Sequence, residues 1–187
     1  MGKLDGRTAL VTGASRGIGE HSARALAAEG ARVALAARSV PDMERIAGEL
    51  DGAIVLETDL SLPGAGEDLA VGAIAALGGV DILVNNAGVS EQAGNEAGVM
   101  QINYIAPLET TKALLNQMSE RGHGSVIHVS SIAGQSGIAD SPTYSASKAA
   151  IDSLTRTQAT AFGQQGVRVN AVAPGLIITE MWANGRK

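Results

Sequence analysis

Two side chains in the second half of the sequence have a spacing that suits acid–base chemistry. Tyr144 and Lys148 stand four residues apart in a stretch of helical length, so their side chains share one face of the expected helix. A free tyrosine has a pKa of about 10 and is a weak base at neutral pH, but a nearby ammonium favours its phenolate form. Ser131 adds a hydroxyl thirteen residues before Tyr144, at the end of an aliphatic run. These three residues are candidates for proton transfer to or from a bound oxygen, although Tyr-x-x-x-Lys alone is a common surface pair.

A glycine-rich turn near the start of the chain is a candidate phosphate site. Thr12-Gly13-Ala14-Ser15-Arg16-Gly17-Ile18-Gly19 follows the first aliphatic run and opens the first helical stretch. In a doubly wound sheet, this turn brings a dinucleotide pyrophosphate to the positive end of a helix. Glycines permit the tight turn and remove the Cβ atoms that would keep phosphates away. The spacing differs from G-x-G-x-x-G, so the prediction depends on the position of the turn in the fold.

The residues after the second aliphatic run bear on the choice of dinucleotide. The sequence there is Ala36-Ala37-Arg38-Ser39, where an NAD-preferring site would place Asp or Glu for the ribose diol. Arg38, with Arg16 in the glycine turn, would instead attract a 2′-phosphate. The sequence therefore favours NADP(H) over NAD(H).

The elements that must position these residues alternate along the chain. Strands are expected at Thr8–Thr12, Arg32–Ala36, Ala53–Glu57, Asp81–Asn85, Ser125–Ser130 and Arg168–Val172. Helices are expected at Ile18–Glu29, Pro41–Leu50, Glu67–Leu77, Glu96–Arg121 and Pro142–Gln164. This order predicts a doubly wound α/β fold of the Rossmann type, with about six parallel strands in a three-layer α/β/α arrangement.

Composition narrows the classes of function. The 187 residues fit a single dinucleotide-binding domain over 1–187. A net charge of −5 and only one Trp, two Tyr and one Phe argue against a nucleic-acid partner. The absence of cysteine excludes disulfides, thiolate metal sites and cysteine nucleophiles. No stretch suits a bilayer span and residues 1–7 are polar, so we expect a cytoplasmic protein without a membrane partner.

A different chemistry fits the same glycine turn. Gly13-Ala14-Ser15-Arg16-Gly17 also satisfies G-x-S-x-G, the nucleophile elbow of serine hydrolases. Only one strand precedes it, whereas such an elbow follows a central strand well into the chain. The possible bases are His21, His123 and His128, and none lies in an obvious late loop after an acid. A hydrolase using Ser15 stays an alternative.

Taken together, the motifs resemble the classical short-chain dehydrogenase/reductase family, and its 3-oxoacyl reductase and ketoreductase members in particular. The turn Thr12–Gly19 is similar to the family's T-G-x-x-x-G-x-G, and Asn85-Asn86-Ala87-Gly88 to its N-N-A-G. Ser131 followed by Tyr144-x-x-x-Lys148 reproduces the catalytic spacing, and Asn103 stands where the family carries its active-site Asn. Asp59-Leu60 resembles the adenine-contacting pair, and Pro174–Thr179 the P-G-x-I-x-T segment along the nicotinamide.

The resemblance implies hydride transfer between a nicotinamide and a carbonyl or secondary alcohol, with a small-molecule substrate and no metal. Tyr144 would be the general acid or base and Ser131 would bind the substrate oxygen. Lys148 would bind the ribose hydroxyls, and Asn103 would hold a helix irregularity and a water. The implied cofactor contacts are Gly13, Ser15, Arg16, Gly17, Ile18, Gly19, Arg38, Asp59, Leu60, Asn86, Ala87, Gly88, Tyr144, Lys148, Pro174, Gly175, Ile177 and Thr179. Family members assemble as dimers or tetramers, so a homo-oligomer is expected.

Two departures from the family pattern affect the substrate half. The segment between Gly88 and Asn103 is short, and the sequence ends at Lys187, where the family continues with a substrate lid, a helix pair and a last strand. We expect NADP binding to survive and turnover to be slow or unselective. The alternative function is an NADP-binding protein of this family with little or no catalysis.

Overall fold

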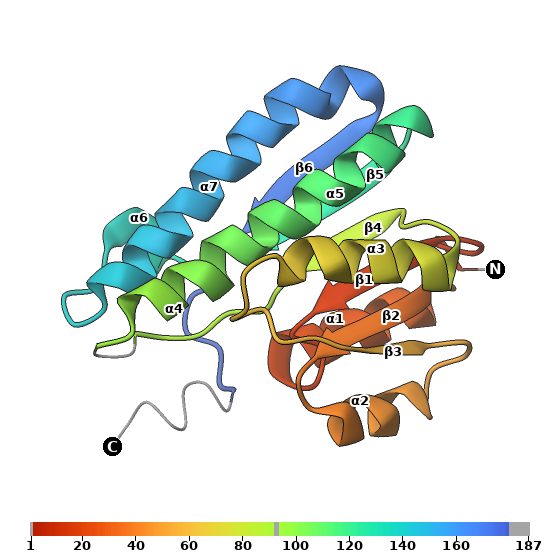
Figure 1. The fold of residues 1–187 in the computed structure, drawn as a ribbon, viewed down its shortest axis with the longest axis horizontal. Helices are drawn as coiled ribbons and strands as arrows, with labels where there is room; N and C mark the ends of the chain where they lie inside the picture. The colour runs from red at the N-terminus through yellow and green to blue at the C-terminus, as the bar shows by residue number, and fades with distance from the viewer. Residues whose placement is uncertain (1, 92–93, 180–187) are drawn as a thin grey trace.

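The computed structural model describes residues 2–91 and 94–179, and these form one parallel sheet covered by helices on both faces (Figure 1). Its strands are β1 (Thr8–Thr12), β2 (Arg32–Ala37), β3 (Ile54–Glu57), β4 (Ile82–Asn85), β5 (Gly124–Val129) and β6 (Val167–Val172). The sheet has six strands in the order β3-β2-β1-β4-β5-β6. The predicted doubly wound Rossmann-type α/β fold is confirmed.

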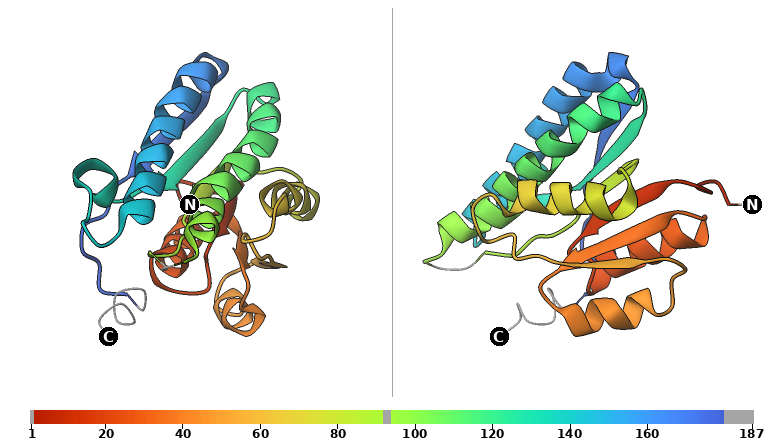
Figure 2. Two further views of the ribbon diagram at one scale, coloured as in Figure 1. Left: turned by 60° about the vertical axis from the view of Figure 1, so that its left-hand side comes forward. Right: turned by 45° about the vertical axis from the view of Figure 1, so that its right-hand side comes forward.

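The helices divide between the two faces of the sheet. Helices α1 (Gly17–Ala28) and α2 (Val40–Ala47) cover one face, and α3 (Ala65–Leu77), α5 (Ala106–Glu120) and α7 (Pro142–Phe162) lie side by side on the other (Figures 1 and 2). Successive side chains of β1 point to opposite faces of the sheet and contribute to both core layers. Leu10 packs with α3 and α5, while Ala9 and Val11 pack with α1 and α2. Among the described residues, no helix combines the length and apolarity needed to cross a bilayer.

The helix expected over 96–121 is interrupted. It consists of α4 (Glu96–Met100), a π-helical turn η1 (Gln101–Ile105) and α5. A π-helical turn inserts an extra residue into the helical register, and such turns are frequent at functional sites. The irregularity at Asn103 that the family resemblance implied is therefore present. A short helix α6 (Ala133–Ser136) was not predicted, and α7 passes into a 3-10 turn η2 (Gly163–Gln165).

The strand order explains where a ligand can bind. All strands are parallel, so their carboxyl ends meet at one edge of the sheet. Strand β1 pairs with β2 on one side and β4 on the other, so the chain order reverses there. A crevice opens at such a reversal because the connections leave toward opposite faces. The loops after β1 and β4 border it.

Helix α3 approaches α5 closely at one glycine. A Cβ at Gly66 would lie 2.5 Å from the Ala106 carbonyl oxygen and 2.8 Å from Glu109 Cβ. Gly72, farther along the same helix, has nothing within 4 Å of the equivalent position. A side chain at position 66 would therefore collide with α5, whereas one at position 72 would have open space around it.

We expect Gly66→Ala to lower the free energy of unfolding by about 1–3 kcal/mol, because a backbone oxygen must move. Gly72→Ala should raise it by about 0.5–1 kcal/mol through helix propensity. Urea denaturation of both variants and the parent measures the two changes. Equal effects of the two substitutions would contradict this description of the α3–α5 contact.

Candidate active site

The glycine turn between β1 and α1 presents main-chain donors to the crevice. Gly13 and Gly17 have positive φ angles of 63° and 56°, which glycine adopts without strain. A Cβ at Gly19 would overlap the Gly13 carbonyl oxygen, so this glycine packs beneath the turn. Arg16 precedes α1 in extended conformation and its side chain makes no capping hydrogen bond. The first N–H groups of α1 are thus left for an anion.

Asn86 and Thr12 tie the loops after β4 and β1 together. Asn86 Nδ2 donates to the carbonyl oxygens of Thr12 and Gly13, at 2.9 and 3.1 Å. Thr12 Oγ1 accepts from the backbone N–H groups of Asn86 and Ala87, both at 3.0 Å. The two loops that border the crevice are therefore held in a fixed relation.

Asn103 holds the next part of the β4 loop from behind. Its Oδ1 accepts from Val89 N at 2.8 Å, and its Nδ2 donates to Val89 O at 2.9 Å and to Ser147 Oγ at 3.0 Å. Ser147 Oγ donates to the Tyr144 carbonyl oxygen at 2.7 Å. Asn103 and Ser147 are 1% and 0% exposed. The π-helical turn and the first turns of α7 are joined through these side chains.

Lys148 is buried beneath the end of β5. Its ammonium donates to the Val129 carbonyl oxygen at 2.8 Å and lies 5.8 Å from the centroid of the Tyr144 ring. Burial lowers the pKa of this ammonium from its usual 10.5 to about 8, because the charged form loses water, and the charge of Asp152 opposes the shift. Ser130 Oγ donates to the Lys148 carbonyl oxygen at 3.3 Å and links strand and helix.

Ser131 follows β5 and faces the same space. Its Oγ accepts from Ala133 N at 3.1 Å, which leaves the hydroxyl proton for another acceptor. Helix α6 then lies against α7 at Gly134, where a Cβ would stand 2.8 Å from the backbone of Lys148 and Ala149. This glycine lets the Ser131 segment lie directly on the main chain of the Lys148 helix.

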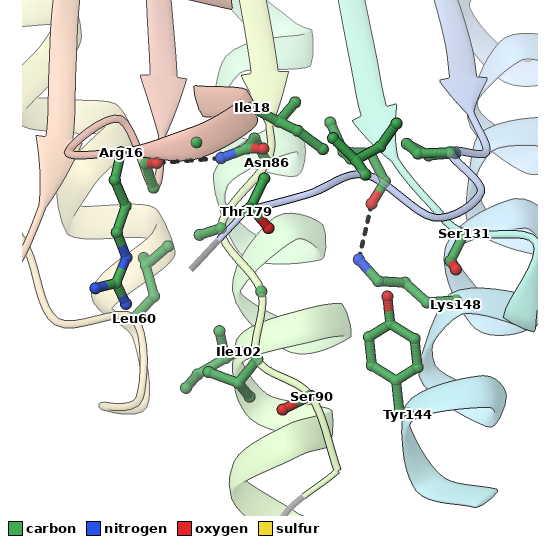
Figure 3. Close-up of a pocket in the computed structure, with 18 of the residues that line it drawn as sticks. Arg16, Ile18, Leu60, Asn86, Ser90, Ile102, Ser131, Tyr144, Lys148 and Thr179 are labelled. Carbon is green, nitrogen blue, oxygen red and sulfur yellow. Dashed lines mark hydrogen bonds between the residues drawn. The ribbon is translucent and has the colours of Figure 1, made fainter. Parts of the chain in front are cut away.

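The glycine turn, the loop after β4 and the side chains of Ser131, Tyr144 and Lys148 line one cavity of about 850 Å³ at the carboxyl edge of the sheet (Figure 3). Arg16 and Leu60 lie at one end, and Ser131, Lys148 and Tyr144 at the other, with the Tyr144 hydroxyl and the Lys148 amine pointing inward. The predicted site residues that line it are Gly13, Ser15, Arg16, Gly17, Ile18, Arg38, Asp59, Leu60, Asn86, Ala87, Gly88, Ser131, Tyr144, Lys148, Pro174, Gly175, Ile177 and Thr179. The two predicted residues outside the lining are Gly19 and Asn103, which act from beneath the turn and behind the loop.

The residues that line the cavity suit an elongated dinucleotide. The glycine turn leaves uncapped N–H groups at a helix start, and side chains at Gly13 would collide with Ala87 Cα at 2.9 Å. Arg16 and Arg38 are exposed at that end and form no salt bridge with any described residue. Ser61 hydrogen bonds lower the pKa of the Asp59 carboxyl, and the Arg38 charge lowers it further. An anion-accepting end thus joins an end that holds a phenol, an amine and a hydroxyl.

A family model described as short chain dehydrogenase matches residues 7–187. The chain belongs to the short-chain dehydrogenase family.

Curated members of the family support this membership along most of the chain. A 3-alpha-(or 20-beta)-hydroxysteroid dehydrogenase of Mycobacterium bovis is 35% identical over 96% of this chain and 72% of its own. The 3-oxoacyl-[acyl-carrier-protein] reductase FabG of Vibrio cholerae is 36% identical over 95% and 76%. These relatives are oxidoreductases, and so is this short-chain dehydrogenase.

Solved structures agree with the fold. A short chain dehydrogenase/reductase family protein has a TM-score of 0.92 at 38% identity, over 98% of this chain and 80% of its own. A Beutenbergia cavernae protein, provisionally assigned as an NAD(P)-dependent gluconate 5-dehydrogenase and solved with NADP at low occupancy, has a TM-score of 0.91 at 33% identity, over 98% and 77%. A nicotinamide dinucleotide is the cofactor class of this family.

The Ser15 hydrolase alternative finds no support in the site. His21 lies on α1 and contacts the Gly17 carbonyl oxygen, and His123 contacts Arg7 and Asp81. His128 is fully buried between Asn85 and Gln158. None of the three histidines hydrogen-bonds Ser15 in the described structure.

Several residues that line the cavity or position α7 were not predicted from the sequence. Glu91 lines the cavity, and its Oε2 accepts from Tyr144 N at 2.7 Å. Ser147 and Gly134 position α7 as described above. For Ser147 the only signal was its place one residue before Lys148, and for Glu91 there was none, because it lies in an irregular loop.

A buried chain of polar side chains also went unpredicted. Asn85 Nδ2 bonds to Thr111 Oγ1 at 2.8 Å and to His128 Nδ1 at 3.2 Å, and His128 Nε2 bonds to Gln158 Oε1 at 3.1 Å. Burial lowers the pKa of His128, and this favours the neutral imidazole at pH 7. The hydrogen bond to Gln158 opposes the shift. This chain links β4 and β5 to α5 and α7.

Lys148→Met tests the burial of the ammonium. In the folded protein the lysine loses its proton near pH 8, and in the unfolded chain near 10.5, so parent stability rises as the pH rises through this window. Lys148→Met has no ammonium, so its stability lacks this pH-dependent contribution. We expect the stability of Lys148→Met relative to the parent to fall by about 3 kcal/mol between pH 7 and pH 10.5.

Urea denaturation of the two proteins across this pH range measures the change. Lys112→Met, on the exposed side of α5, is the matched control and should show no comparable pH dependence. A parallel pH response of the parent and Lys148→Met would show that the amine is not desolvated.

Proposed function

We propose that this short-chain dehydrogenase is an NADP(H)-dependent oxidoreductase that interconverts a ketone, or a 3-oxoacyl compound, with the corresponding secondary alcohol. The observation that carries the proposal is the convergence of Ser131, Tyr144 and Lys148 on the cavity that the glycine turn also lines. When bound, the nicotinamide supplies or accepts the hydride. The remaining chemistry belongs to residues of this chain.

Tyr144 moves the proton. In reduction its hydroxyl gives a proton to the substrate oxygen, and in oxidation the phenolate takes it back. Its main chain is held on both sides, because Glu91 accepts from its N–H and Ser147 donates to its carbonyl oxygen. Ser131 donates its hydroxyl proton to the same substrate oxygen and stabilises the charge that develops there.

Lys148 supplies positive charge beside the tyrosine. Its ammonium, 5.8 Å from the ring centroid, stabilises the phenolate electrostatically after the proton has left. A pKa of about 8 keeps this amine mostly protonated at neutral pH. Its remaining donors can bind the ribose hydroxyls of the cofactor.

Tyr144→Phe removes the transferable proton and leaves the ring. We expect kcat for ketone reduction to fall by about 10²–10⁴-fold. The dissociation constant for NADPH, measured by fluorescence titration, should stay within about threefold of the parent value, because packing is preserved. Tyr104→Phe is the matched control, since Tyr104 lies in η1 outside the cavity lining.

The outcome also separates this proposal from the alternative of a cofactor-binding protein with little catalysis. NADPH binding by the parent without NADPH consumption on any ketone of a broad panel would favour that alternative. Full activity of Tyr144→Phe would remove Tyr144 from the mechanism.

Arg38 and Arg16 select NADP(H) in this proposal. Both guanidinium groups lie at the cavity end opposite Tyr144 without a salt bridge to a described residue, so they can pair with a 2′-phosphate.

Arg38→Asp should lower the ratio of kcat/KM for NADPH to that for NADH by about tenfold or more, because a carboxylate repels the 2′-phosphate and accepts from the ribose diol. Steady-state kinetics with both cofactors measures the ratio. Arg156→Asp, exposed on α7 outside the cavity, makes the same charge change and should leave the ratio unaltered. An unchanged ratio in Arg38→Asp would refute its role.

A further inference from the structure

The carboxylate of Glu91 lies at the substrate end of the cavity in a fixed position. Its Oε2 accepts from Tyr144 N at 2.7 Å, in the first turn of α7. The helix has no side-chain cap from Ser141, so this bond satisfies one of its open N–H groups. A negative charge is also attracted by the positive end of the helix dipole. The Glu91 carboxylate is therefore held beside the residue that carries the proton.

A second carboxylate lines the same end. Asp140 stands in the segment between α6 and α7, four residues before Tyr144, and is exposed to the cavity. Neither Glu91 nor Asp140 forms a salt bridge with a described residue. Their charges are therefore not neutralised by a cationic side chain within the described structure.

The cations of the cavity are placed elsewhere. Arg16 lies across the cavity from Ser131 and Tyr144 (Figure 3). Arg38 also lines the cavity and follows β2, which lies on the other side of β1 from β4 and β5. The only described cation that lies against the Tyr144 ring is Lys148, a residue that is 5% exposed and whose amine donates to Val129 O. Uncharged side chains also line the cavity, among them the apolar Ile102, Ile138 and Leu176 and the hydroxyls of Ser90 and Ser141.

From this distribution of charge we infer that the site selects uncharged or cationic ketones and rejects substrates that carry a carboxylate near the reacting carbonyl, with Glu91 as the specificity-determining residue. The inference rests on the proposed function and names its substrate class. A carboxylate bound beside the carbonyl would meet Glu91 across a cavity with low-dielectric walls, where like charges repel more strongly than in water. A neutral ester or ketone of the same size meets no such penalty.

The test uses ethyl acetoacetate and acetoacetate, which share the reacting ketone and differ in charge. We expect the parent to show a kcat/KM for the ester at least about tenfold above that for the anion at low ionic strength. Glu91→Gln keeps an oxygen that can accept from Tyr144 N and removes the charge. It should raise the ratio of kcat/KM for the anion to kcat/KM for the ester at least about threefold, whatever change in Tyr144 positioning lowers both values together.

Glu67→Gln is the matched control, because Glu67 is exposed on α3 and lies outside the cavity lining. It should leave both values unchanged. Equal use of ester and anion by the parent, or an equal effect of Glu91→Gln on both, would overturn the inference while ketone reduction itself stands.

Binding gives the same comparison without turnover. Calorimetric titration of acetoacetate into the protein with NADP⁺ should show tighter binding by Glu91→Gln than by the parent, and unchanged affinity would overturn the inference. A parent that neither binds NADPH nor reduces any ketone would refute the proposed function instead, and the inference with it.

Discussion

The site depends on keeping one ammonium group almost out of water. Lys148 is held by a main-chain carbonyl at the end of β5, and no carboxylate forms a salt bridge to it among the described residues. Burial of this kind destabilises the charged form, so the surrounding fold has to supply the stability. The apolar layers on the two faces of the sheet, built on strand residues such as Leu10, Val11 and Leu83, provide it. In return the charge stays close to the Tyr144 ring.

Tyr144 is positioned through its backbone as much as through its ring. Its N–H donates to Glu91, and its carbonyl oxygen accepts from Ser147. Asn103 in turn donates to Ser147 and accepts from the Val89 N–H. The π-helical turn places Asn103 where it can reach both partners. The loop after β4 thus connects the glycine turn, through Asn86, with the helix that carries the phenol. A bound cofactor would touch both sides of this connection.

Much of this arrangement could be read from local sequence signals. The doubly wound parallel sheet follows from alternating aliphatic and helical stretches, and the candidate phosphate site from the place of the glycine turn after the first strand. The catalytic candidates were found by their spacing, because Ser131 follows β5 while Tyr144 and Lys148 lie one turn apart in α7. The predicted ends of some elements differ from the observed ones: α3 begins at Ala65 rather than Glu67, and β5 spans Gly124–Val129 rather than 125–130.

The contacts that could not be predicted join segments far apart in the chain. Glu91 meets Tyr144 across 53 positions and His128 meets Gln158 across 30, and no local pattern encodes such pairs. Asn103 was placed by the family resemblance, but its burial depends on the π-helical turn, which an ordinary helical period does not reveal.

Gly134 has a consequence for how the protein can diverge. Because α6 lies on the main chain of Lys148 and Ala149 at this glycine, the hydroxyl of Ser131 and the amine of Lys148 share one rigid support. Mutational drift after β5 that moved one group would displace the other as well. New substrate preferences can evolve more readily at side chains such as Ile102 and Leu176, which line the cavity and do not belong to α6 or α7.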